Sequence, residues 1–196
     1  MFCSTELVEV LVSTLSEAAL VYLDEEKHSG RKISLVVLQA LLEMLHNILK
    51  QTSAVVRAAL QSQRLSCSAA ETEAAEKLLV ANRPLSQLNA HLIHMLSSES
   101  QEVWEESLQC LSLLVQLYGG EGQDGLSSSC LQSFSHLLCT HMNAETPRIQ
   151  RTTLRIIKRL LPVKSVSNFV ALIKANLEEG ALQYSCYFSN TGSLVC

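Results

Sequence analysis

The sequence is poor in the residues that build turns, sheets and charged surfaces. Only 3 prolines and 7 glycines occur among 196 residues, aromatic residues make up 5% of the chain and charged residues 17%. Runs of β-branched residues, which favour strands, are also missing. Leucine dominates the apolar content instead, and leucine is a strong helix former. The composition therefore predicts an all-α protein.

The hydrophobic content and the net charge further limit the kind of protein that the chain can form. Hydrophobic residues account for 47% of the chain, so a packed core can form and disorder by composition is excluded. The formal net charge is −4, which argues against broad electrostatic binding to nucleic acid or to an anionic membrane.

Cysteine usage and the first residues indicate the compartment. The seven cysteines are scattered, odd in number and without a CxxC pair, as expected for free thiols in a reducing compartment. The N-terminus has no basic region, and polar residues interrupt the apolar stretch 7–23. This stretch is neither a signal peptide nor a membrane span. We expect an intracellular protein, cytoplasmic or nuclear.

Apolar residues recur at helical spacing in nine segments, which are separated by glycine, proline or short polar turns. The predicted helices span residues 6–27, 31–50, 53–61, 69–81, 85–96, 101–118, 126–142, 148–161 and 163–177. Residues 121–125 are expected to form a flexible loop.

An internal repeat is the strongest signal in the chain. Three of the predicted helices carry apolar residues at relative positions 0, 5, 8 and 12. These sets are Ile33, Leu38, Leu41, Leu45; Val103, Leu108, Leu111, Val115; and Ile149, Leu154, Ile157, Leu161. A helical hairpin that cannot bury its apolar stripe alone stacks on its neighbours. Three unrelated amphipathic helices in an irregular bundle are the alternative.

The segments 102–108 and 147–154 resemble the start of the second helix in HEAT and armadillo repeats. The resemblance covers roughly residues 6–177 and implies stacked helical hairpins, an α-solenoid that serves as a protein-binding scaffold. The acidic residues Glu99 and Glu145 fit the turn of such repeats, whereas Trp104 departs from the basic residue common there.

The C-terminal part of the sequence does not continue this pattern. Residues 163–177 resemble the first helix of another hairpin, and an irregular, uncharged tail follows at 181–196. We expect a helical-repeat domain over 1–180 that is incomplete at its C-terminal end, as in a fragment or splice form. A tail that folds back as an unusual cap is the alternative.

The leucine-, serine- and cysteine-rich composition of the helices is similar to that of two kinds of repeat protein. It resembles the armadillo-like meiosis inhibitor protein, which implies a role at meiotic chromosomes. It also resembles the repeat region of unc-51-like pseudokinases, which implies a segment of a signalling protein.

Signatures of catalysis are missing from the sequence. It contains no GxSxG, and the glycine-rich loop at 119–125 lacks the Lys-Ser/Thr of a phosphate loop. His136, Cys139 and His141 do not have the spacing of a zinc site. We expect no enzyme activity, no catalytic residue, no metal, no cofactor and no small-molecule substrate.

Two surface features are candidates for partner binding. Arg148, Arg151, Arg155 and Arg159 are spaced to lie along one helix face, either as a solvated stripe or as a docking ridge for an acidic peptide or a phosphate backbone. Trp104 lies among acidic residues, either as an exposed interface anchor or buried between repeats.

The sequence thus predicts a non-enzymatic scaffold segment that holds an unidentified protein partner. A nucleic-acid-associated module that uses the ridge from Arg148 to Arg159 is the alternative, although the net charge of −4 counts against it. A poorly folded isoform without a function of its own is a third reading.

Overall fold

A computed structural model describes residues 5–25, 34–65, 69–119, 134–135, 147–160 and 174. Helices account for nearly all of these residues, and no strand occurs among them, which confirms the all-α prediction for this part of the chain. The elements are α1 (Thr5–Glu25), α2 (Leu35–Arg64), α3 (Ala69–Asn82), the 3₁₀ segment η1 (Arg83–Leu88), α4 (Asn89–Met95), α5 (Gln101–Tyr118) and α7 (Pro147–Leu160).

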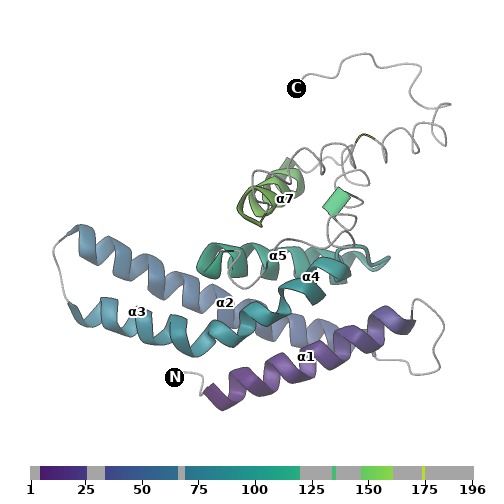
Figure 1. Cartoon of the computed structure of the whole chain (residues 1–196), viewed down its shortest axis with the longest axis horizontal. Helices are drawn as coiled ribbons and strands as arrows, with labels where there is room; N and C mark the ends of the chain where they lie inside the picture. The colour runs from purple at the N-terminus through teal and green to yellow at the C-terminus, as the bar shows by residue number, and fades with distance from the viewer. Residues whose placement is uncertain are drawn as a thin grey trace.

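Helix α5 lies at the centre of the arrangement (Figure 1). It packs against α2, α4 and α7, while α2 and α3 form a long hairpin and α1 contacts α2, α4 and η1. The core is rich in leucine, as the composition predicts. In α2 the fully buried leucines Leu38, Leu42, Leu45 and Leu49 follow one another at helical spacing.

Helix α2 is longer than the sequence suggests. Separate helices over 31–50 and 53–61 are the sequence prediction, and this was wrong, because one helix of 30 residues runs through the polar stretch between them. Thr52 and Ser53 are buried there. The Thr52 hydroxyl donates to the Ile48 carbonyl at 2.8 Å and accepts from the Asn82 amide of α3 at 2.8 Å. The polar residues therefore join two helices rather than end one.

The chain between α3 and α5 is less regular than predicted. A single helix over 85–96 was expected, but the structure has η1 followed by the short helix α4. Pro84 lies in the first turn of η1, where its missing N–H is tolerated. The Tyr22 hydroxyl of α1 hydrogen bonds to the Ser98 hydroxyl at 2.5 Å. This bond fixes the turn that leads into α5.

The predicted bounds of α5, 101–118, are confirmed. Gly119 follows with φ of 64°, a left-handed conformation in which glycine alone pays no steric cost, and its N–H donates to the Val115 carbonyl at 3.0 Å. The predicted helices 126–142 and 163–177, the loop at 121–125 and the tail at 181–196 lie outside the described residues, apart from residues 134–135 and 174.

Candidate partner-binding site

Helix α7 concentrates positive charge on one side. It holds five of the chain's 15 basic residues and none of its 19 acidic residues. Its apolar side packs on α5 and buries Thr153, Ile156 and Ile157. The rest of its surface exposes Arg151, Arg155, Lys158 and Arg159. This strong amphipathic division places a basic face beside the central helix of the molecule.

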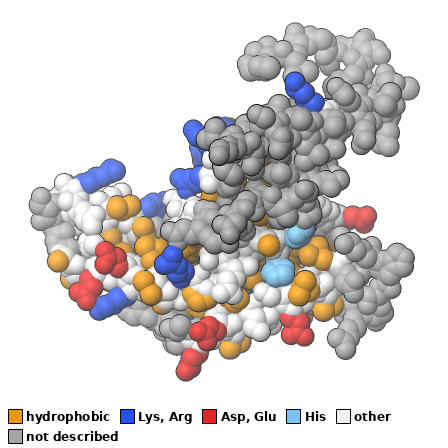
Figure 2. All heavy atoms as spheres, viewed as in Figure 1, with side chains coloured by type: hydrophobic (Ala, Val, Ile, Leu, Met, Phe, Trp, Pro, Cys, Tyr) orange, Lys and Arg blue, Asp and Glu red, His pale blue; other side chains and the backbone are white. Residues whose placement is uncertain are grey.

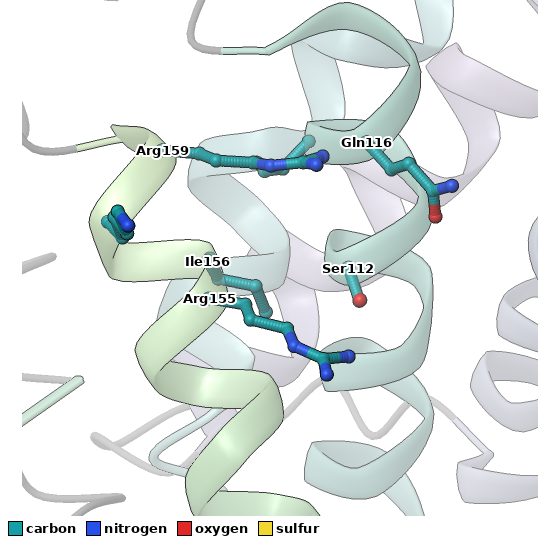
Figure 3. Close-up of a pocket in the computed structure, with 7 residues that line it drawn as sticks. Ser112, Gln116, Arg155, Ile156 and Arg159 are labelled. Carbon is teal, nitrogen blue, oxygen red and sulfur yellow. The ribbon is translucent and has the colours of Figure 1, made fainter.

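A pocket of about 540 Å³ opens between α5 and α7. Val115 and Ile156, both almost fully buried, contribute its apolar surface. The polar lining consists of Ser112 and Gln116 from α5 and of Arg155, Lys158 and Arg159 from α7. In Figure 3 the side chains of Arg155 and Arg159 extend from α7 toward α5, near Ser112 and Gln116 respectively.

The same view shows that α5 and α7 run in the same direction, because Ser112 faces Arg155 and Gln116 faces Arg159, each four residues further along (Figure 3). Helix α5 also packs against α2. Gln39 hydrogen bonds to Glu102, His46 pairs with Glu106 and the Cys110 thiol donates to the Leu42 carbonyl, so α2 and α5 lie against each other over this length. Helix α5 thus lies in contact with both α2 and α7.

The charge in the pocket is uncompensated within the described part of the chain. None of the lining residues is acidic. The ion pairs found among described residues are those of His46 with Glu106 and of Lys77 with Glu73, and neither involves α7. Positively charged side chains that crowd together without a carboxylate favour the approach of an anion.

The predicted arginine ridge is therefore only partly assembled at the pocket. Arg155 and Arg159 line it, Arg151 is exposed on the same helix outside the lining, and the side chain of Arg148 is not among those described. Sequence reasoning missed Ser112 and Gln116. Their spacing of four residues places them on one face of α5, but the sequence does not show which helix covers that face.

Trp104 takes the buried position of the two that the sequence left open. Its exposed fraction is 6%, and it belongs to the hydrophobic core together with its neighbour Val103. The structure therefore does not show Trp104 as an exposed interface anchor. A contribution of Trp104 to partner binding remains a prediction, and it would act through the position of α5.

One residue of the repeat pattern departs from its predicted place. Leu154 corresponds to the buried Leu108, which is 2% exposed, but Leu154 itself is 55% exposed. The reason is that α5 is covered by helices on several sides, whereas α7 packs against α5 in the described part of the chain. The shared apolar spacing therefore does not place Leu154 in the core.

Two other ionisable side chains, Cys110 and His91, are not among the residues that line the pocket. The Cys110 thiol donates to the Leu42 carbonyl at 3.5 Å, and burial, with a smaller contribution from Glu106, raises its pKa well above the ordinary value. The pKa of His91 is lowered by partial burial and by repulsion from His94.

No cluster of three metal-binding side chains and no helix long and apolar enough to cross a membrane occurs among the described residues.

Comparison with known proteins relates the chain to part of a longer protein. No protein-family model matches the chain, and no solved structure does. The serine/threonine-protein kinase ULK4 of Mus musculus is 38% identical to this chain over 174 residues. The chain is homologous to a segment of ULK4. The alignment covers 86% of this chain but 13% of ULK4. The chain therefore spans about an eighth of that relative, and the activity of the whole kinase is not carried over by the match.

This homology supports one of the two resemblances found in the sequence. It agrees with the similarity to unc-51-like pseudokinases, and it gives no support to the meiotic role.

Proposed function

We propose that this chain is a non-enzymatic protein-binding segment of a pseudokinase-type signalling protein related to ULK4. In this proposal stacked helical hairpins form a scaffold, and a partner with an acidic segment docks on the basic face of α7. The partner is a protein, and neither a cofactor nor a small-molecule substrate is required. The pocket between α5 and α7 is the observation that carries the proposal.

The arrangement of the helices supports a scaffold. The contacts of α5 with α2 on one side and with α7 on another are what the second helices of successive hairpins would show. In such arrays one face of neighbouring second helices forms an extended binding surface. The homology to part of a much longer protein is in keeping with a segment that works together with other parts of its parent.

The distribution of charge supports a localised acidic partner. The basic residues of α7 stand out against a chain with a net charge of −4. Figure 2 shows Lys and Arg side chains near α7 and acidic side chains over other parts of the same face. A partner with a short acidic segment meets attraction at α7, whereas a long polyanion also meets the acidic regions.

The test compares two charge-reversal variants with equal charge change. Arg155→Glu/Arg159→Glu alters the pocket, and Lys50→Glu/Arg64→Glu alters two exposed cations of α2. Partners are captured from cell extract, purified and titrated against each protein after circular dichroism has shown that the helices are intact. We expect the α7 variant to lose at least tenfold in affinity, about 1.4 kcal/mol, and the α2 variant to bind like wild type.

Two results contradict the proposal. Equal loss in both variants means that net charge, and not the face of α7, controls binding. Capture of RNA or DNA, with affinity that falls steeply as salt rises, favours the nucleic-acid-associated module instead.

A further inference from the structure

The pocket between α5 and α7 has the chemistry of an anion-binding recess rather than of a flat charged surface. Two guanidinium groups reach from α7 toward α5 (Figure 3), and Lys158 adds a third cation to the lining. The Ser112 hydroxyl and the Gln116 amide supply further donors from the opposite wall. None of these side chains is paired with a carboxylate within the described residues.

We infer that this pocket binds the phosphate of a phosphorylated serine or threonine in the protein partner. The inference rests on the proposed function, because it names the part of the partner that the α7 face recognises. A phosphate monoester carries close to two negative charges at neutral pH and three acceptor oxygens. It therefore meets the excess of cations and donors in the pocket more completely than a carboxylate does.

The geometry of α7 favours a tetrahedral dianion. Arg155 and Arg159 are separated by four residues, which is about 6 Å along the helix axis, and both line the pocket. Each guanidinium can donate two parallel hydrogen bonds to a pair of phosphate oxygens. A planar carboxylate has two oxygens, so it satisfies one guanidinium fork and leaves the second without a full partner.

The floor of the pocket suits a side chain rather than a nucleic-acid backbone. Val115 and Ile156 are 1% and 2% exposed and close the base of the pocket, so a ligand meets mainly the polar and charged side chains of its walls. Along α5 the acidic residues Glu102 and Glu105 precede the pocket and are at least partly exposed. They repel a polyanion that continues along α5 but leave a single phosphate in the pocket unaffected.

The experiment measures binding to peptide pools that differ at one fixed position. Fluorescent short peptides with randomised flanks carry phosphoserine, serine or glutamate at the centre, and the full chain is titrated into each pool at about 0.15 M salt. Inorganic phosphate alone serves as a competitor. We expect the phosphoserine pool to bind at least about tenfold more tightly than the glutamate pool and the serine pool to bind most weakly.

Three double variants test whether the guanidinium groups of Arg155 and Arg159 recognise the phosphate. Arg155→Gln/Arg159→Gln is expected to abolish the preference for phosphoserine. Arg155→Lys/Arg159→Lys keeps the charge but removes the planar forks, so we expect it to weaken phosphoserine binding several-fold and to bring it close to glutamate binding. Lys50→Gln/Arg64→Gln removes the same charge from α2 and is expected to leave the preference unchanged.

The outcomes separate this inference from the proposed function. Equal affinity for phosphoserine and glutamate overturns the phosphate site, although an acidic partner still docks on α7. Inorganic phosphate that binds as tightly as the phosphoserine pool also overturns it, because the pocket then recognises a free anion. If purified partner binding survives Arg155→Gln/Arg159→Gln and the pools do not bind, both proposals fail.

Discussion

Helices α5 and α7 carry the same apolar spacing but have different roles in the molecule. Helix α5 buries Val103, Leu108, Leu111 and Val115, all four residues of its repeat set. Helix α7 buries Ile157, leaves Ile149 half-buried and exposes Leu154. The acidic residues of α5 lie in its N-terminal half, whereas α7 has no acidic residue at all. One helix therefore organises the core and the other presents a basic surface.

This difference shows that the burial of the apolar residues of a helix depends on the helices that pack around it. Helix α5 contacts helices from three other parts of the chain, so nearly every apolar side chain on it is covered. Helix α7 packs on α5 through the face of Ile156 and Ile157, and Leu154, Arg155, Lys158 and Arg159 are exposed. Equal spacing in the sequence therefore does not predict equal burial.

The largest expected effect concerns the centre of the core. Trp104→Ala removes a large side chain that is 6% exposed in α5, and we expect a loss of about 3–5 kcal/mol in the free energy of unfolding. Chemical denaturation followed by circular dichroism measures it. A loss below about 1 kcal/mol would show that the side chain is not packed as the structure has it.

The equivalent leucines of the two helices give the sharpest form of the comparison. We expect Leu108→Ala to cost about 2–5 kcal/mol, because the residue is 2% exposed and its removal leaves a cavity. Leu154→Ala, at a position 55% exposed, is expected to change the free energy of unfolding by less than about 1 kcal/mol. Equal losses in the two variants would show that α7 is covered as fully as α5.

A smaller effect is expected where α5 ends. The Tyr118 hydroxyl donates to the Leu79 carbonyl of α3 at 3.0 Å and so joins the end of α5 to α3. Tyr118→Phe removes this half-buried hydrogen bond and is expected to cost about 1 kcal/mol at neutral pH.

The same tyrosine predicts a dependence on alkaline pH. Burial raises the pKa of Tyr118 from 10.0 to about 12. Above pH 10 the unfolded chain loses the phenol proton while the folded protein keeps it, so the stability gained from the protonated phenol falls as pH rises toward 12. We expect the wild type to lose more stability than Tyr118→Phe between these values. Parallel pH profiles of the two proteins would contradict this assignment.

The smallest expected effect concerns the stability contributed by the basic face. Arg155→Gln/Arg159→Gln is expected to change the free energy of unfolding by less than about 0.5 kcal/mol, since both side chains are exposed and no ion pair of theirs occurs among the described residues. Urea denaturation measures this change. A loss above about 1 kcal/mol would show that the two arginines stabilise the fold and do not act in partner binding alone.

The sequence predicts the helices well where a breaker residue marks their ends. The bounds of α5 follow from the polar turn before it and from Gly119, and α3 ends at Asn82, two residues before Pro84 and one residue beyond the prediction. The sequence fails at Thr52 and Ser53, because polar residues that end a helix and polar residues that bond across two helices have the same composition. Only the contact with Asn82 distinguishes the two cases.

The candidate site was predictable only in its charged half. The spacing of the arginines indicates a basic helix face, and the structure places Arg155 and Arg159 at a pocket. The other wall depends on which face of α5 meets α7, and this is set by packing between segments about 40 residues apart that the local pattern does not contain. Leu154 shows the same limit, since its exposure depends on the neighbours of α7 and not on its own helix.

The most direct test of the account is the affinity of one purified partner for three forms of the chain. These are wild type, Arg155→Gln/Arg159→Gln and the matched control Lys50→Gln/Arg64→Gln, titrated under the same salt conditions. The account predicts at least tenfold weaker binding for the α7 variant and an unchanged affinity for the α2 variant. Unchanged binding by the α7 variant, or equal weakening of both, would contradict the claim that the pocket between α5 and α7 is the binding site.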